Sequence, residues 1–180
     1  MASVTLSPSG TILGSGWSNI SWLGTEDGST ATYSISAKSY SDYVTVPFTS
    51  AGLAAGDVID GIEITVKGAG STASWLSLNN VSLPKGSSQS QATRTWGGSL
   101  ANQVLGGPTD LWSASWTASD FNSSWSLQFR VYNARSSSVT AYVDYVSVTI
   151  YYHPGTVTHD AAAALTLAPT ITTTAVRQVN

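Results

Sequence analysis

The stretch Ser138-Val-Thr-Ala-Tyr-Val-Asp-Tyr-Val-Ser-Val-Thr-Ile-Tyr-Tyr152 decides the fold of this chain. Because β-branched and aromatic residues dominate it, the pattern predicts one strand long enough to cross a whole sheet. In the preceding stretch, 124–133, apolar and polar residues alternate with period two, which is typical of a strand with one buried face. The apolar positions are Trp125, Leu127, Phe129 and Val131. These two patterns predict sheets with one face in a core.

The same pattern predicts further strands when the reading is extended outward along the chain. The expected ranges are 31–36, 42–48, 62–66 and 75–83. The pair Asp60-Gly61 predicts a strand entry or a bulge, and a phase change at Asn79-Asn80 predicts a second bulge. No segment has a helical pattern of comparable strength. Short strands between turns rich in Gly, Ser and Asn predict an all-β fold, an antiparallel jelly-roll-like β-sandwich.

The composition changes after Tyr152, where His153-Pro154-Gly155 indicates the end of the sandwich. We therefore expect one β-sandwich domain over 1–153, with 1–29 as an extended or loop-rich lead-in, and an extended C-terminal arm over 154–180. The arm is rich in β-branched residues and is expected to dock by adding a strand to a neighbour. A disordered terminus is the alternative. The candidate docking residues are Leu165, Leu167, Pro169, Ile171 and Val176.

Charged residues are scarce. Of the 180 residues, 9% are Asp, Glu, Lys or Arg, and the net charge is −3 with the basic residues scattered singly. Since nucleic-acid binding needs a basic stripe, we expect no nucleic-acid partner. The absence of Cys excludes disulfides and thiolate metal sites, and no apolar run is long enough to span a membrane. The N-terminus lacks the pattern of a secretory signal, so we expect a protein made in the cytoplasm.

Four segments resemble a β-sandwich module of virion structural proteins of tailed bacteriophages. They are DVIDGIEITVK (57–67), GGPTDLW (106–112), WTASDFNS (116–123) and YVDYVSVTIYY (142–152). Their order and approximate spacing match over residues 30–152, which is most of the chain. The region 85–107 departs from the pattern, and we expect a variable loop there that serves as a contact surface.

The resemblance implies a non-enzymatic virion structural protein. A capsid decoration or head-surface protein is the expected role, and a small tail or fibre ornament is the other placement. The expected location is the virion, after synthesis in the cytoplasm of the host bacterium. The expected partners are the major capsid or tail proteins of the same virion and neighbouring copies of this chain. A homo-oligomer is therefore expected, and a trimer would suit three-fold lattice positions.

Seven Trp residues raise an alternative function, carbohydrate binding, because an indole face can stack on a sugar ring. We expect Trp112 and Trp116 to close one end of the sandwich. Trp17, Trp22 and Trp96 lie in segments rich in Gly and Ser and are the candidates for a glycan contact or a subunit contact. The alternative is therefore a tail- or fibre-associated module that recognises glycans of the host surface.

Catalysis is not expected. A hydrolytic triad needs a histidine beside its nucleophile, but His153 and His159 lie at or beyond the end of the domain. Asp110, Asp120 and Asp144 stand close to aromatic residues and could in principle supply a glycosidase pair, but Asp120-Phe-Asn122 fits a turn made by Asx side chains. The sequence therefore predicts a protein without a catalytic site.

Asp144 interrupts an otherwise apolar strand, so its carboxylate needs a partner on whichever face it lies. Structural hydrogen bonding is one explanation. A Ca²⁺ site built from Asp57, Asp60 or Asp144 with backbone carbonyls is the other, but the chain has no EF-hand loop pattern. We expect neither a metal nor a cofactor.

Overall fold

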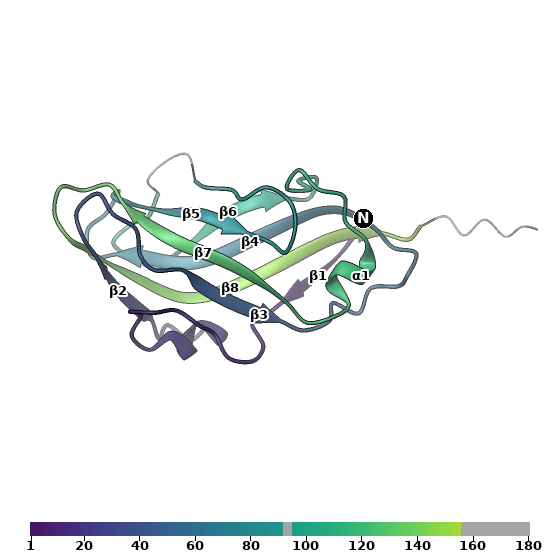
Figure 1. The fold of residues 1–180 in the computed structure, drawn as a ribbon, viewed down its shortest axis with the longest axis horizontal. Coiled ribbons are helices and arrows are strands. Elements are labelled where there is room, and N and C mark those ends of the chain that lie inside the picture. The colour runs from purple at the N-terminus through teal and green to yellow at the C-terminus, as the bar shows by residue number, and fades with distance from the viewer. Residues whose placement is uncertain (92–94, 156–180) are drawn as a thin grey trace, which may run out of the picture.

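The structure, a computed structural model, describes residues 1–91 and 95–155, which form two antiparallel sheets (Figure 1). The strands of sheet A are β1 (Ala2–Leu6), β2 (Ala31–Ile35), β4 (Val58–Gly70), β6 (Ala101–Gly107) and β8 (Val139–His153). The strands of sheet B are β3 (Val44–Phe48), β5 (Leu76–Ser82) and β7 (Trp125–Asn133).

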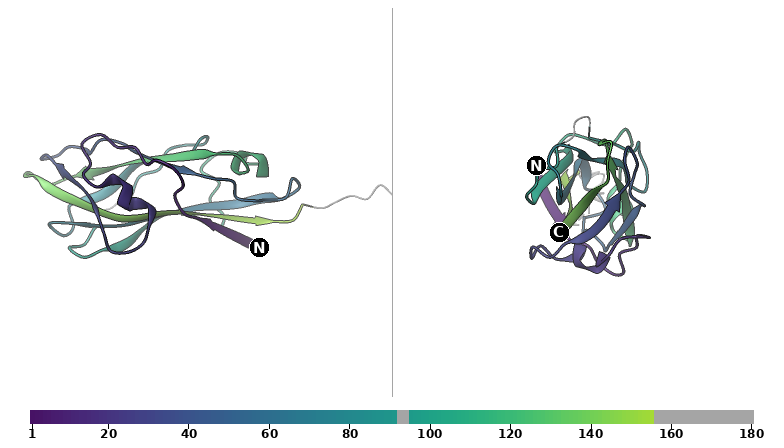
Figure 2. Two further views of the ribbon diagram at one scale, coloured as in Figure 1. Left: turned by 90° about the horizontal axis from the view of Figure 1, so that it is seen from below. Right: turned by 90° about the vertical axis from the view of Figure 1, so that its left-hand side faces the viewer.

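The strand order gives the sandwich its topology. Sheet A is ordered β1-β8-β4-β6, with β2 also paired to β8, and sheet B is ordered β3-β7-β5. From β2 onward, successive strands alternate between the two sheets, in the manner of a jelly roll. The strands run along the long axis of the molecule (Figure 2). The predicted all-β, jelly-roll-like fold class is confirmed.

The core lies between the two sheets and follows the predicted alternation. In β7, every second residue from Trp125 to Val131 is buried. The opposite side chains, which point outward, are Ser126, Gln128, Arg130 and Tyr132. In β4, Ile62, Ile64 and Val66 are fully buried as their spacing predicts.

Both predicted bulges are present. The pairing of β4 with β8 shifts register between Ile59 and Gly61, and the pairing of β5 with β7 shifts between Asn79 and Ser82. Asn80 adopts a left-handed backbone with φ 46°, a conformation that Asn tolerates better than most residues. A third shift, which the sequence did not predict, lies between Lys67 and Gly68.

Two strands, β1 and β6, lie outside the ranges that the sequence predicts as strands. β1 lies inside the expected lead-in and pairs with the end of β8, where Ala2 faces Tyr152. β6 lies inside 85–107, expected to be a variable loop, and Leu105 faces Ile64 of β4. The sequence of β6 is ANQVLGG, which has one β-branched residue. This strand is therefore formed by its pairing with β4 rather than by local β propensity.

The segment between β1 and β2 closes one side of the sandwich. Leu13 forms a bridge with Thr45 of β3, and Ser18 forms a bridge with Thr32 of β2, so the segment contacts both sheets. It contains η1 (Ile20–Gly24), a 3₁₀ helix whose Leu23 is fully buried. Part of the lead-in, which was expected to be extended or loop-rich, therefore packs against the core.

A short helix, α1 (Ala118–Phe121), stands where an Asx turn was expected. Thr117 and Asp120 form a capping box at its start. Trp116 stacks on Phe121 with ring centroids 5.0 Å apart, so this helix covers core aromatics. Within residues 1–91 and 95–155, neither helix has the length and apolar character needed to cross a membrane.

Candidate functional site

Two of the three predicted contact tryptophans are buried. Trp17 is 7% exposed and Trp96 is 0% exposed. Nε1 of Trp17 donates to the backbone carbonyl of Asp42 (3.2 Å), and Nε1 of Trp96 donates to Oε1 of Gln91 (3.3 Å). Because their rings pack in the core, neither presents a face to a glycan or a second subunit. The prediction is wrong for these two residues.

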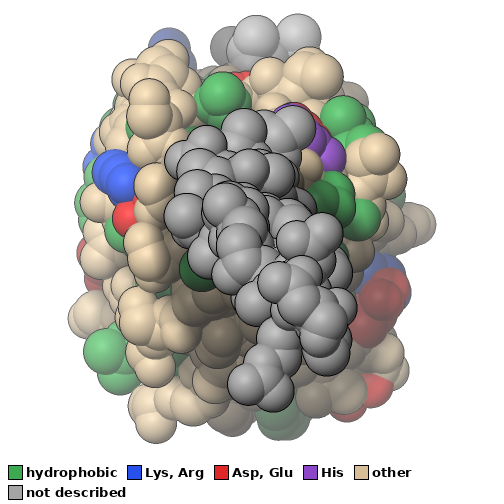
Figure 3. Space-filling view, turned by 90° about the vertical axis from the view of Figure 1, so that its right-hand side faces the viewer, with side chains coloured by type: hydrophobic (Ala, Val, Ile, Leu, Met, Phe, Trp, Pro, Cys, Tyr) green, Lys and Arg blue, Asp and Glu red, His purple; other side chains and the backbone are tan. Residues whose placement is uncertain are grey.

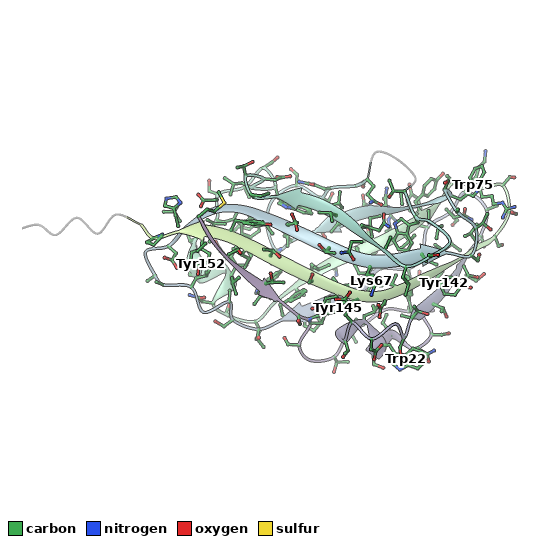
Figure 4. The ribbon with its side chains drawn as sticks, turned by 180° about the vertical axis from the view of Figure 1, so that it is seen from behind. Trp22, Lys67, Trp75, Tyr142, Tyr145 and Tyr152 are labelled. Atoms are coloured by element: carbon green, nitrogen blue, oxygen red, sulfur yellow. The ribbon has the colours of Figure 1, made fainter. Side chains whose placement is uncertain are left out.

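Trp22 is the predicted tryptophan that keeps an accessible ring. It lies in η1 and is 46% exposed. η1 contacts β2 and β8 of sheet A, and Figure 4 places Trp22 on the same side as Lys67, Tyr142 and Tyr145. Among the described residues, no aromatic ring pairs with that of Trp22. Trp22 therefore offers a single ring.

A cluster of aromatic rings surrounds one guanidinium on the outer face of sheet B. We call it the tyrosine–arginine face; it comprises Tyr40, Tyr43, Asn80, Arg130 and Tyr132. Tyr40 forms a backbone bridge with Tyr132, and their ring centroids are 4.8 Å apart. Cζ of Arg130 lies 3.9 Å from the ring centroid of Tyr40 and 5.0 Å from that of Tyr43. The guanidinium is thus held by two rings.

The neighbouring elements fix the tyrosines while leaving them accessible. Asn80 at the β5 bulge donates from Nδ2 to the hydroxyl of Tyr43 (3.0 Å). Tyr40 is held by Tyr132 and Arg130. Tyr40 and Tyr43 are each 42% exposed. The face is therefore an ordered aromatic platform open to solvent.

The rest of sheet B is polar and nearly uncharged. Its three strands contain no Asp, Glu, His or Lys, and Arg130 is their single charged residue. On the outer side, Nε2 of Gln128 donates to Oγ1 of Thr45 (3.1 Å). Rings, amides and hydroxyls therefore share this surface. The sequence patterns do not predict this surface as a binding site; the outward polar side of the 124–133 stretch is the one sequence signal for it.

Asp144 has the structural partners that its position predicted. Its side chain is fully buried, and Oδ1 accepts a hydrogen bond from the backbone N–H of Gly28 (3.0 Å). Oδ2 lies 3.0 Å from Nζ of Lys67. The geometry of this contact is not that of a hydrogen bond. The contact is an ion pair, because the two opposite charges lie in direct contact.

Asp57 and Asp60 are paired elsewhere. Oδ2 of Asp57 accepts from the backbone N–H of Ala54 (2.8 Å), and Oδ1 of Asp60 lies 2.8 Å from Nδ1 of His153. The structure thus does not bring the three aspartates together. Within the described ranges, no group of three His, Cys, Asp or Glu side chains is placed to hold a metal ion.

Of the three carboxylates that glycoside hydrolysis could use, Asp110 and Asp120 also have local structural roles. Asp110 accepts from the backbone N–H of Trp112 (2.8 Å) and from Gln89 (2.8 Å). Asp120 caps α1 and lies 2.6 Å from Nζ of Lys85. No pocket is found in the described part of the molecule.

The remaining predicted residues lie outside the described residues. They are His159 and the docking residues Leu165, Leu167, Pro169, Ile171 and Val176. The docking role of the arm stays a prediction.

Comparison with known proteins identifies neither a matching family model nor a matching curated protein. Several solved structures are similar. A structure titled "CBM4 structure and function" has 12% identity and a TM-score of 0.39, covering 81% of this chain and 92% of that one. TmCBM61 in complex with β-1,4-galactotriose has 13% identity and a TM-score of 0.41, covering 80% and 87%.

The N-terminal cellulose-binding domain of Cellulomonas fimi β-1,4-glucanase C has 12% identity and a TM-score of 0.33, covering 86% of this chain and 90% of that chain. Similarity at these values does not assign a function.

Proposed function

We propose that this chain is a non-enzymatic carbohydrate-binding protein that binds glycans on the tyrosine–arginine face. One observation carries the proposal. Two tyrosine residues, each 42% exposed, have rings that flank the guanidinium of Arg130, and the strands of sheet B supply amides and hydroxyls but no acidic side chain. This combination matches the chemistry of a sugar, which has apolar C–H faces and a rim of hydroxyls.

Rings and polar groups would contribute differently to glycan binding. Tyrosine rings provide rigid apolar area with a polar tip. Arg130 and Asn80 provide donors for sugar hydroxyls. Since Tyr43 is already held by Asn80 and Tyr40 by Arg130, binding would cost little side-chain ordering. An open platform of this kind suits a chain of sugars that lies along a surface.

A binding role is favoured over a catalytic one by the residues of the same face. Hydrolysis of a glycosidic bond uses two carboxyl groups beside the sugar, and the strands of sheet B contain none. The hydroxyl-rich, weakly charged composition of the chain also suits a surface that contacts neutral or weakly charged polymers.

A virion setting is a second, compatible proposal, supported by the resemblance of four sequence segments to tailed-phage structural proteins. A surface protein of a virion that binds glycans would bring the particle to its host. To test this setting, full-length protein and a version ending at Pro154 are incubated with phage particles that lack the protein. Attachment of the full-length form alone supports the predicted arm, and attachment of neither form contradicts the setting.

Glycan binding is tested with a panel of soluble polysaccharides in affinity gel electrophoresis. We expect the double variant Tyr40→Ala/Tyr43→Ala to lose at least about tenfold in affinity, because two rings worth roughly 1 kcal/mol each are removed. Trp22→Ala is the matched control, since it removes an equally exposed ring from another element. Unchanged binding by the double variant, or a loss with Trp22→Ala alone, would contradict the assignment of the site.

A further inference from the structure

The geometry points to an acidic glycan as the ligand of the tyrosine–arginine face, with its carboxylate bound by Arg130. This inference rests on the proposed glycan-binding function and specifies its ligand class. The ligand is a saccharide that bears carboxylate groups along its chain, such as those of uronates, rather than a neutral polymer.

Arg130 has no anionic partner in the described part of the chain. In the described part of the chain, no ion pair or hydrogen bond joins its side chain to another residue. Lys67 and Lys85, by contrast, each lie within 3.0 Å of a carboxylate oxygen. A guanidinium has five N–H donors and binds carboxylates through two parallel hydrogen bonds.

The guanidinium of Arg130 is held in position by the two tyrosine rings. The rings of Tyr40 and Tyr43 lie 3.9 Å and 5.0 Å from Cζ, so they limit its movement. Nε of Arg130 is buried and has no hydrogen-bond partner. The two terminal nitrogens also have no hydrogen-bond partner among the described residues, but they are not buried. The terminal nitrogens are therefore the donors that remain open to solvent. A guanidinium held in this position can donate two parallel hydrogen bonds to a planar anion.

The strands of sheet B contain no acidic residue that would neutralise Arg130. Arg130 faces Asn79 across β5, and Arg130 is the one charged residue in the strands of sheet B. The loop between β2 and β3 contains one acidic residue, Asp42. Its carboxylate is directed toward Gly16, where an added β-carbon would lie 3.3 Å from Oδ2. The face is thus locally positive although the whole chain has a net charge of −3.

A stacked arginine could also act only as a clasp that holds two tyrosines together. The clasp and the anion-binding role differ in what they predict for ligand charge. If Arg130 is a clasp, carboxylates on the ligand make no difference to affinity. If Arg130 binds a carboxylate, removing that group from the ligand and removing Arg130 have the same effect.

The test compares polygalacturonate, alginate and hyaluronate with their carboxyl-reduced forms, which keep the sugar backbone and lose the charge. We expect at least one acidic polymer to bind about tenfold more tightly than its reduced form at low ionic strength. This preference should decrease as salt is added. Arg130→Gln should abolish the preference while leaving the weak binding of the reduced form.

Two further variants control the result. Lys85→Gln removes the same unit of charge away from the face and should keep the preference. Arg130→Lys keeps the charge but loses the fork, so its preference should be intermediate. Circular dichroism of each variant shows whether the sandwich is intact.

The outcomes separate the inference from the proposed function. If acidic polymers and their reduced forms bind equally, or if only neutral glycans bind, the ligand is not an acidic glycan. Either result leaves the proposed glycan-binding function in place. An acidic preference that survives Arg130→Gln also overturns the inference. If no acidic, reduced or neutral polymer binds, both the inference and the proposed function are wrong.

Discussion

Nζ of Lys67 on β4 lies 3.0 Å from Oδ2 of Asp144, a fully buried residue at the bulge of β8. The other carboxylate oxygen of Asp144 accepts a hydrogen bond from Gly28, so this side chain ties the segment before β2 to sheet A. Lys67 has a second partner in Glu26, whose side chain is 54% exposed. One ammonium group thus joins a buried carboxylate and an exposed one.

We predict that Asp144→Ala lowers the free energy of unfolding by about 2 kcal/mol, because it removes charge-assisted hydrogen bonding and leaves the Gly28 amide without its partner. Glu26→Gln is the matched control and should cost less than about 1 kcal/mol, as exposed ion pairs usually do. Urea unfolding measures both. Equal effects of the two substitutions would show that burial of Asp144 does not matter.

The same ion pair predicts a loss of stability in alkali. Contact with the carboxylate of Asp144, and then with that of Glu26, raises the pKa of Lys67 above its ordinary value of 10.5. The stabilisation is therefore complete below about pH 10.5 and is lost as the pH rises through the raised pKa of the folded state. Urea midpoints should fall over this range, and less steeply in Asp144→Ala. Tyr151→Phe serves as a control, because burial and Glu63 also raise the pKa of Tyr151.

The capping box of α1 predicts a separate effect in acid. Burial tends to raise the pKa of Asp120, but hydrogen bonds from Lys85 and Thr117 outweigh it and lower the pKa below 3.8. The stabilisation is therefore present above about pH 3.8 and is lost as the pH falls through the lowered pKa. Thr117→Ala should cost about 1 kcal/mol at neutral pH. Thermal unfolding at neutral and acidic pH checks both; an unchanged Tm in Thr117→Ala would contradict the capping role.

The sequence predicted those parts of the fold whose pattern is local. The alternation in β7 and the length of β8 are visible in consecutive residues, and both follow from burial of one strand face. β6 could not be predicted in this way, because ANQVLGG has weak β propensity and forms a strand only against β4. Propensity reports local preference, whereas edge strands depend on their neighbours.

The candidate site was less predictable than the fold. Tyr40 and Tyr43 are far from Arg130 and Tyr132 in the sequence, and the pairing of Tyr40 with Tyr132 is what brings them together. Predicting this face would have required the register between sheet B and the loop before β3. Trp17, in contrast, was expected at the surface because its neighbours are Gly and Ser, yet its ring packs against Tyr33 with centroids 5.2 Å apart. Composition alone does not show which way a loop side chain points.

We predict that position 106 in β6 requires glycine. Its φ is +79°, and an added β-carbon would collide with the backbone carbonyl of Ile62 and lie 2.8 Å from Nε1 of Trp112. That nitrogen donates to the same carbonyl at 2.9 Å. Gly106→Ala should therefore destabilise the protein by roughly 2 kcal/mol or more. Gly98→Ala, where an added carbon meets nothing within 4 Å, is the control in urea unfolding. Similar costs for both would argue against this contact.

Trp22 provides a reporter that lies outside the tyrosine–arginine face. Trp22 is 46% exposed, whereas Trp75 is partly buried and the remaining five tryptophans are buried. We predict that Trp22→Phe lowers the acrylamide quenching of the intrinsic fluorescence more than Trp75→Phe does, because collisional quenching requires access to the ring. A glycan bound on sheet B should leave the quenching of Trp22 unchanged. Protection of Trp22 by a glycan that Tyr40→Ala/Tyr43→Ala still binds would instead place the binding surface at η1.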